Sequence, residues 1–279
     1  GWDSSLTVAG GVLIVPLFEG KQDMGLRGIN VKDGKTLWEV PLACSRHATP
    51  CIWTHEGKQY VLTATVAGAL RLIEPATGNV LWTVEGLGQN HCSLIASERH
   101  VFVNVGTKRP RKEDSDQMYG LLGAYAITPK GAKLAWKLPD EPAFLLSTWM
   151  DSCARRFYAV ADGKVYYCAN AVPRPEQPLY VLDEDDGKVL AKLIINSPAL
   201  QFYPAGDRLL TIRDASHSET ELAFIRFDGK ELKQLTEFWH PPHMNTTAYE
   251  VYMEFPFADG KLYLRTKDGR VACYDLSAR

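Results

Sequence analysis

The chain has 279 residues, of which 46% are hydrophobic and 23% are charged, and its formal net charge is -2. These values are ordinary for a globular protein, and they provide no basic field for nucleic acid or an anionic membrane. No apolar run approaches the roughly 18 residues that a transmembrane helix needs. We therefore expect no nucleic-acid partner and no transmembrane segment.

The N-terminal region does not resemble a signal peptide. The apolar stretch from Val8 to Phe18 is short, contains Gly-Gly and proline, and has no basic segment before it. The chain begins at Gly1, close to a first strand, and we expect that any leader has been removed. We expect residues 1–279 to form a single domain, with most of the six cysteines buried as small apolar side chains.

A hairpin-like segment recurs along the chain. Each copy has a short apolar strand, a polar turn that contains glycine, and a second strand. Glycine supplies the positive φ that tight hairpin turns require. The copies span residues 28–40, 70–84, 123–138, 179–193 and 223–235, and a sixth begins at 271–276 and stops before its turn.

Two further strands precede each of these hairpins. The second of them is rich in β-formers, and the six copies begin near Val12, Tyr60, Val101, Val165, Leu209 and Leu262. Each unit therefore reads as four strands, A to D, and no stretch shows a helical period. Repeats of 40 to 50 residues with four strands predict an all-β fold, a β-propeller of about six four-stranded blades. The last blade lacks its D strand, or the chain is cut from a seven- or eight-bladed parent.

The turns also carry a motif, in which a glycine precedes a tryptophan by about four residues. It is clearest at Thr77, Gly78 and Trp82. This pattern resembles the PQQ-like (quinoprotein-type) β-propeller repeat, which is similar to the propeller of the outer-membrane assembly lipoproteins. The resemblance implies that Trp38, Trp82 and Trp136 dock between neighbouring blades, and that Ala191 and Lys233 mark lost docks. It also implies a periplasmic or surface location in bacteria.

Long insertions predict which face binds. D–A connections and B–C loops fall on one face of a propeller, and the long segments 106–117, 170–178, 214–220 and 238–250 all belong to it. The starts of the A strands should ring the channel mouth on that face. The candidate ligand-binding rim comprises Trp2, Asp3, Arg46, His47, Asn90, His91, Trp149, Asp151, Glu250 and Tyr252.

This rim has two interpretations. It is a polar pocket for a small ligand, a metal or a peptide, or it is the solvated channel edge that every propeller has. His47 and His91 occupy equivalent places in adjacent blades, and with Asp3, Asp151 or Cys92 they would supply metal-ligand types. We assign no metal and no catalytic residue. The basic run 108–112 is followed by acidic residues that cancel most of its field.

Three functions remain open. The first is a non-catalytic binding scaffold that engages a protein or peptide, or a small ligand, through the insertion-bearing face. The second is a PQQ- or metal-dependent enzyme of the quinoprotein dehydrogenase type, although such enzymes have adjacent cysteines in the active site and this chain has none. The third is a carbohydrate-binding ectodomain, in which Trp2, Trp149, Trp239 and Tyr252 stack on sugar rings. We expect the scaffold, with no cofactor.

Overall fold

The computed structural model describes residues 5–19, 22–41, 48–90, 93–110, 118–146, 158–169, 177–195, 199–205, 207–214, 220–241, 256–265 and 270–276. Apart from one short 3-10 helix, Pro142–Phe144, the regular structure of these residues is β-strand. None of them forms a helix with the length and apolar character to cross a bilayer. The chain divides into unit 1, Gly1–Ala154 with Glu184–Gly187, and unit 2, Arg155–Asp183 with Lys188–Arg279.

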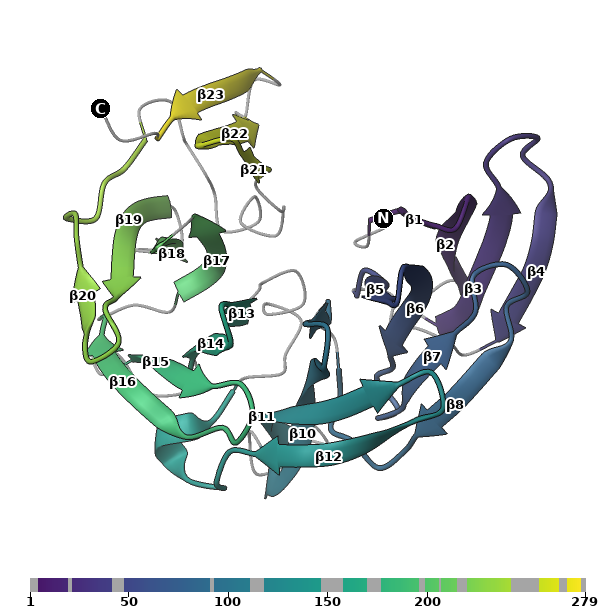
Figure 1. Cartoon of the computed structure of the whole chain (residues 1–279), viewed down its shortest axis with the longest axis horizontal. Helices are drawn as coiled ribbons and strands as arrows, with labels where there is room; N and C mark the ends of the chain where they lie inside the picture. Colours follow the sequence, from purple (N-terminus) through teal and green to yellow (C-terminus); the bar gives the residue numbers. More distant parts are fainter. Residues whose placement is uncertain are drawn as a thin grey trace. The chain divides into compact units, whose positions relative to one another are not determined.

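Unit 1 contains three four-stranded antiparallel sheets, each with its strands in chain order (Figure 1). We name the sheets blades 1 to 3. Blade 1 is β1 (Thr7–Ala9), β2 (Val12–Glu19), β3 (Gln22–Asn30) and β4 (Thr36–Pro41). Blade 2 is β5 (Cys51–His55), β6 (Lys58–Ala64), β7 (Leu70–Ile73) and β8 (Val80–Val84). Blade 3 is β9 (Ile95–Ala96), β10 (His100–Pro110), β11 (Met118–Thr128) and β12 (Gly131–Lys137).

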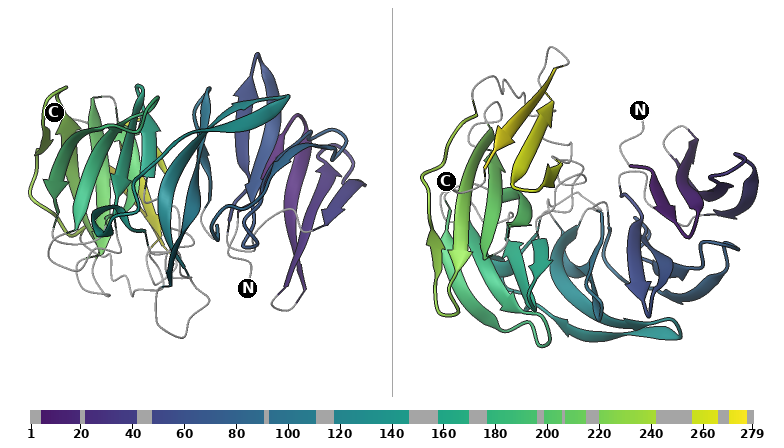
Figure 2. Two further views of the ribbon diagram at one scale, coloured as in Figure 1. Left: turned by 90° about the horizontal axis from the view of Figure 1, so that it is seen from below. Right: turned by 45° about the horizontal axis from the view of Figure 1, so that its top comes forward.

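Unit 2 holds the strands of blades 4 to 6, and Figure 2 shows them side by side within each sheet. Blade 4 is β13 (Tyr158–Ala161), β14 (Lys164–Cys168), β15 (Pro178–Asp183) and β16 (Val189–Ile194). Blade 5 is β17 (Ala199–Ala205), β18 (Arg208–Asp214), β19 (Thr220–Phe227) and β20 (Leu232–Gln234). Blade 6 is β21 (Phe257–Ala258), β22 (Lys261–Arg265) and β23 (Val271–Asp275). The predicted succession of blades is confirmed, with three strands in the described part of the last.

The A–B turns of blades 2, 4 and 6 share one geometry. Both central residues have positive φ in each turn, 48° and 77° at Glu56 and Gly57 for example. This is the pattern of a type I′ turn, which suits the twist of antiparallel strands. The three turns are Glu56–Gly57, Asp162–Gly163 and Asp259–Gly260, and a lysine follows each one. Equivalent positions can therefore be compared directly among these blades.

A β-bulge lies where the D strand joins its blade. In blades 1 to 4 the pairing between strands C and D shifts by one residue, as between Leu72 and Ile73 of β7. A bulge bends the strand and redirects a side chain. The residues beside the bulge are Trp38, Trp82, Trp136 and Ala191, which pair with Gly28, Leu72, Ala124 and Val181 respectively.

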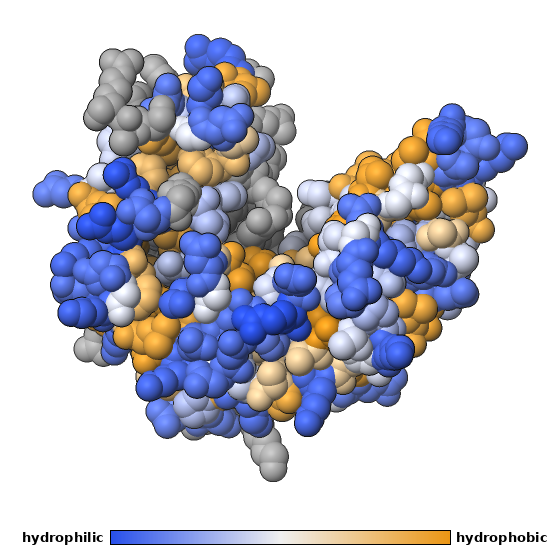
Figure 3. All heavy atoms as spheres, in the orientation of Figure 1, coloured by the Kyte–Doolittle hydropathy of each residue, from blue (hydrophilic) through white to orange (hydrophobic). Residues whose placement is uncertain are grey.

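The core consists of apolar layers between successive sheets. In unit 1, one layer includes Ile14, Leu26 and Val61, and the next is built around Trp53 and Leu72. In unit 2 the two layers have Val181 with Phe202, and Leu210 with Leu262, near their centres. Each large side chain buried in this way contributes about 1.5–3 kcal/mol. Hydrophobic surface is otherwise scattered among hydrophilic residues (Figure 3).

One predicted loop is partly wrong. Residues 106–117 read as a charged B–C loop, but β10 continues to Pro110, which pairs with Met118 of β11 across an irregular step. The sequence hid this part of the strand because its charged residues do not show the apolar alternation by which a strand is recognised. Residues 111–117 lie outside the described part.

Candidate functional site

Asn90 is the one predicted rim residue that the structure describes. The other nine, Trp2, Asp3, Arg46, His47, His91, Trp149, Asp151, Glu250 and Tyr252, lie outside the described residues. Asn90 is 3% exposed. Its Nδ2 donates to the carbonyls of Gly88 and Asn104 at 2.7 and 3.1 Å, and its Oδ1 accepts from the Asn104 N–H at 2.8 Å. These bonds tie the segment before β9 to β10, so Asn90 has a structural role.

The three tryptophans of the repeat motif dock as the family resemblance implies. Each indole N–H donates to a main-chain carbonyl of the C–D turn that follows in the next repeat. The bonds are Trp38 to Pro75 at 2.8 Å, Trp82 to Thr128 at 2.9 Å and Trp136 to Glu184 at 2.8 Å. A fourth bond that the sequence did not reveal, Trp53 to Glu98 at 3.0 Å, starts from an A strand.

The glycine of the motif makes room for the docked ring. A Cβ on Gly78 would lie 2.6 Å from the Trp38 ring, and a Cβ on Gly187 would lie 2.6 Å from the Trp136 ring. Both glycines also have positive φ, 74° and 71°. Glycine is therefore required twice at these turns, for the backbone conformation and for the close approach of the indole.

A buried carboxylate lies beside the last dock. Glu184 is 4% exposed, and its Oε1 accepts from the Ser97 hydroxyl at 2.5 Å and lies 3.1 Å from His100 Nδ1. Arg99 reaches the other oxygen, Oε2, at 3.7 Å and binds Asp185 as well. Burial raises the pKa of Glu184, but hydrogen bonds from Ser97 and His100 and the charge of Arg99 outweigh it and lower the pKa overall.

This cluster is not arranged for nucleophilic catalysis. A serine nucleophile must be hydrogen-bonded to the imidazole that removes its proton. Here the Ser97 hydroxyl donates to the carboxylate and accepts from the main-chain N–H groups of Arg99 and His100. Ser97, His100 and Glu184 therefore form a structural network that holds the 184–187 turn in unit 1.

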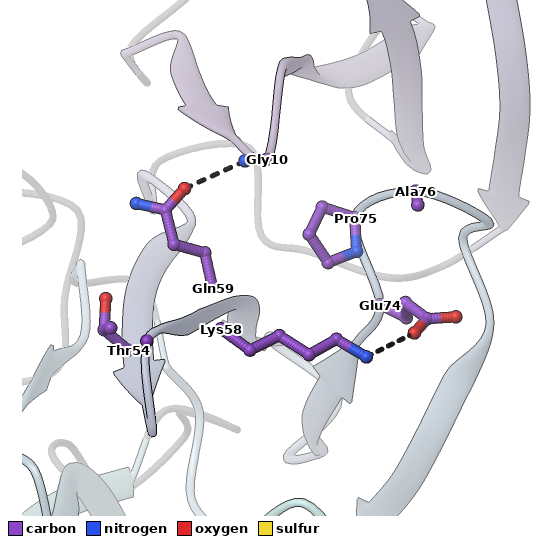
Figure 4. Close-up of a pocket in the computed structure, with 8 residues that line it drawn as sticks. Gly10, Thr54, Lys58, Gln59, Glu74, Pro75 and Ala76 are labelled. Carbon is purple, nitrogen blue, oxygen red and sulfur yellow. Dashed lines mark hydrogen bonds and ion pairs between the residues drawn. The ribbon is translucent and has the colours of Figure 1, made fainter.

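An open cleft of about 420 Å³ lies among the turns at the opposite end of the strands from the B–C loops (Figure 4). It is lined by Gly10 from the β1–β2 turn, by residues at the β5–β6 turn, and by the β7–β8 turn of blade 2. Lys58 Nζ lies 2.8 Å from Glu74 Oε1, and Gln59 Oε1 accepts from the Gly10 N–H at 2.9 Å. The cleft is therefore polar, with its side chains fixed by neighbouring turns.

Two contacts hold the charged pair of the cleft in place. Thr77 donates to Glu74 Oε2 at 2.8 Å, and Lys58 Nζ lies 5.2 Å from the centre of the Tyr60 ring. The hydrogen bond from Lys58, followed by that from Thr77, lowers the pKa of Glu74. The hydrogen bond to Glu74 raises the pKa of Lys58 in turn. Both groups are therefore charged at neutral pH.

Unit 2 has a smaller apolar pocket of about 180 Å³. Leu210, Phe224 and Leu276 line it together with Trp239, whose ring packs edge-on against Tyr274 at 5.6 Å. Trp239 is 41% exposed, and its main chain bridges to Leu222. It is the one member of the predicted sugar-stacking set within the described residues, so its grouping with Trp2, Trp149 and Tyr252 stays a prediction.

The donor sets that a metal would need are not assembled in the parts of the chain that the structure describes. No three His, Cys, Asp or Glu side chains are grouped there. Ca²⁺ needs six to eight oxygen ligands, and the described cysteines Cys51, Cys168 and Cys273 form no disulfide with one another. The histidine pair His47 and His91 lies outside the described residues, so the expectation that the protein has no cofactor stays a prediction.

Sequence reasoning missed the Glu184 network and the cleft. Glu184 lies in the run Asp-Glu-Asp-Asp-Gly, which reads as a solvated turn, and its partners are more than 80 residues away. Lys58 and Gln59 follow a hairpin glycine and read as an ordinary strand start. The sequence of a polar turn does not predict which of its side chains are buried or paired, because the interaction partner comes from another repeat.

Comparison with known proteins agrees with this architecture. The crystal structure of BamB from Moraxella catarrhalis superposes with a TM-score of 0.58 and 13% identity, over 98% of this chain and 72% of that one. A europium-containing methanol dehydrogenase superposes with a TM-score of 0.54 and 10% identity, over 87% of this chain and 55% of that chain. These likenesses show a β-propeller fold.

Sequence comparison points to the same group. Quinoprotein glucose dehydrogenase A of Acinetobacter calcoaceticus is 42% identical over 62 residues, which are 22% of this chain and only 7% of the dehydrogenase. The family model described as outer membrane protein assembly factor BamB matches residues 22–277. With that match over nearly its whole length, the chain belongs to the BamB-like family of PQQ-type β-propellers.

Proposed function

We propose that the protein is a non-catalytic scaffold that binds a protein partner through the face carrying the B–C loops and D–A connections. The observation that carries this proposal is the family match over residues 22–277, whose model is described as an outer membrane protein assembly factor. The long insertions on that face support it, because insertions in repeat proteins gather where they bind. An extracytoplasmic location is part of the same proposal.

The geometry of the described polar groups supports a scaffold as well. The indole N–H groups of Trp38 and Trp136 bind turn carbonyls, and the Glu184 carboxylate binds Ser97 and His100. These groups fasten repeats to one another. A rigid row of blades is what a binding protein needs in order to present loops in a fixed arrangement.

Site-specific photo-cross-linking in the native host tests this proposal. A cross-linking residue replaces Arg111 in the B–C segment of blade 3, or His217 in that of blade 5. The matched control replaces Lys130, which is exposed in the C–D turn at the other end of β11. We expect the same envelope protein to be captured from Arg111 and His217 and not from Lys130. Capture from Lys130 alone, or different proteins from the two loops, would contradict the proposed face.

The second candidate is a quinoprotein-type enzyme, favoured by the 62-residue likeness to a quinoprotein glucose dehydrogenase. Thermal unfolding with PQQ and Ca²⁺ tests it. A ligand at about 100 times its dissociation constant adds roughly 2.7 kcal/mol to the free energy of unfolding. A saturable shift that needs both additives would favour the enzyme, and an unchanged midpoint would leave the scaffold.

A further inference from the structure

The cleft at the β5–β6 turn departs from the pattern of the protein's own repeats. The type I′ turns of blades 2, 4 and 6 align residue by residue, and the residues two positions outside the turn on each side are apolar in the later copies. They are Val160 with Val165 in blade 4, and Phe257 with Leu262 in blade 6. In blade 2 the same cross-strand pair is Thr54 with Gln59.

Burial follows the same division. Val165 and Leu262 are fully buried, whereas Thr54 and Gln59 are both exposed and line the cleft. A repeat that gives up buried apolar area at this position loses stabilisation that the other copies keep. Local departures from a pattern that favours folding are expected at functional sites. This substitution therefore marks the cleft of blade 2 as a candidate binding site.

The cleft presents fixed hydrogen-bond donors. The Gly10 N–H donates to Gln59 Oε1, which orients the amide and leaves Nε2 without a hydrogen-bond partner among the described residues. Glu74 holds the Lys58 ammonium through one contact, and an ammonium carries three donors. Figure 4 shows the Lys58 side chain reaching toward Glu74 and the Gln59 side chain reaching toward Gly10, both from β6. The Lys58 ammonium and Gln59 Nε2 can therefore donate further hydrogen bonds to a ligand.

The charges of the cleft disfavour an anionic ligand. Lys58 and Glu74 neutralise each other at 2.8 Å, so a bound carboxylate would add a second negative charge beside Glu74. A neutral acceptor avoids that cost. The main-chain carbonyls of an extended peptide are such acceptors, and the cleft volume of about 420 Å³ lies within the range of roughly 300–1,000 Å³ typical of ligand pockets.

We propose that this cleft binds the carbonyl groups of an extended, uncharged peptide segment through Lys58 Nζ and Gln59 Nε2. The proposal rests on the scaffold function and adds a second contact surface, at the opposite end of the strands from the B–C loops. A partner that uses both surfaces gains affinity from their linkage, because the second contact forms within the complex.

NMR titration of the full chain with capped trialanine, N-acetylated and N-methylamidated, tests the proposal. We expect the Gln59 side-chain amide signals to shift saturably, with a dissociation constant of roughly millimolar order for so small a ligand. Lys58→Met should weaken binding about tenfold, because it removes a charged donor. Gln59→Val, which installs the blade 4 residue, removes that reporter, so binding to this variant is followed by the main-chain amide signals of Gly10 and Lys58, which should no longer shift saturably.

A matched control comes from blade 4. Lys164 follows the equivalent type I′ turn, and Lys164→Met should leave the titration unchanged. The proposal is overturned if capped trialanine gives no saturable shift, if acetate shifts the signals and the peptide does not, or if Lys164→Met weakens binding as much as Lys58→Met. This titration needs no natural partner. A negative result would therefore contradict peptide binding at the cleft, and it would not affect the cross-linking test of the scaffold function.

Discussion

Units 1 and 2 use the same blade but fasten it differently. In unit 1, Trp38, Trp82 and Trp136 each bind a turn carbonyl of the following repeat. In unit 2 the corresponding D-strand position of blade 4 is Ala191, and the layer between blades 4 and 5 is mainly aliphatic, with Phe202, Phe227, Tyr166 and Cys168. A docked tryptophan of unit 1 stabilises the neighbouring repeat both by burying apolar surface and by a directional hydrogen bond. Ala191 in blade 4 can contribute only buried apolar surface at the same position.

Truncation of a docked ring should have the largest effect. Trp136→Ala should lower the free energy of unfolding by about 3–5 kcal/mol, because the ring is 8% exposed and leaves a cavity. Ala191→Gly at the equivalent position of blade 4 should cost about 0.5–1 kcal/mol. Urea unfolding followed by far-UV circular dichroism measures both. Equal losses in the two variants would remove the distinction between the units.

The glycine beneath a docked ring gives the next largest effect. Gly78→Ala should cost about 2–4 kcal/mol, because the new Cβ overlaps the Trp38 ring in addition to the strain of positive φ. Gly34 has a similar φ of 71° with nothing within 4 Å, so Gly34→Ala should cost only about 1–2 kcal/mol. Thermal midpoints of the two variants test the difference. If they coincide, the ring contact is not what the glycine serves.

The Glu184 network sharpens the comparison through pH. The pKa of Glu184 is lowered in the folded state, so its contribution to stability is complete above its unfolded pKa and is lost as the pH falls through the folded pKa. Glu184→Gln should therefore cost about 2 kcal/mol at pH 7. The difference in the free energy of unfolding between wild type and variant should begin to shrink near the ordinary glutamate pKa of about 4.3 and disappear below the lowered pKa of Glu184. The exposed neighbour Glu98 is the control, and a pH-independent difference for Glu184→Gln would contradict the prediction.

The smallest effect concerns the β19–β20 turn of unit 2, which is not bound by any of the three docked indoles. Asp228 accepts main-chain N–H bonds from Lys230 and Glu231 at 3.0 Å, and these bonds lower the pKa of its carboxyl to about 2. The Asp228 side chain thus stabilises the β19–β20 turn through hydrogen bonds to the main chain of the same turn. A carboxyl-carbon NMR titration should give that value for Asp228. A pKa near the ordinary 3.9 of aspartate would show that the side chain does not close the turn.

The repeat made the fold readable from the sequence. Hairpin glycines and alternating apolar strands are local signals, and they predicted the succession of blades correctly. The docking role of Trp38, Trp82 and Trp136 was implied by the resemblance to the PQQ-like repeat, and it is confirmed. The site was much less readable. Asn90 was expected at a ligand-binding rim, yet its side chain is buried and hydrogen-bonded to the main chain of Gly88 and Asn104. Whether a polar residue is buried depends on which residues of a distant part of the chain pack against it. Such long-range contacts cannot be read from a single sequence.

The direction of the docks has a consequence for how the chain is made and cut. Each indole reaches forward to a carbonyl that is 37 to 48 residues later in the chain. During synthesis the tryptophan of each blade in unit 1 therefore stays undocked until the next repeat has left the ribosome. A fragment ending between Ala154 and Asp183 would contain the strands of unit 1 but not Glu184, and would leave Trp136, Ser97 and His100 without their partner. Expression of unit 1 by itself should therefore extend at least through Gly187.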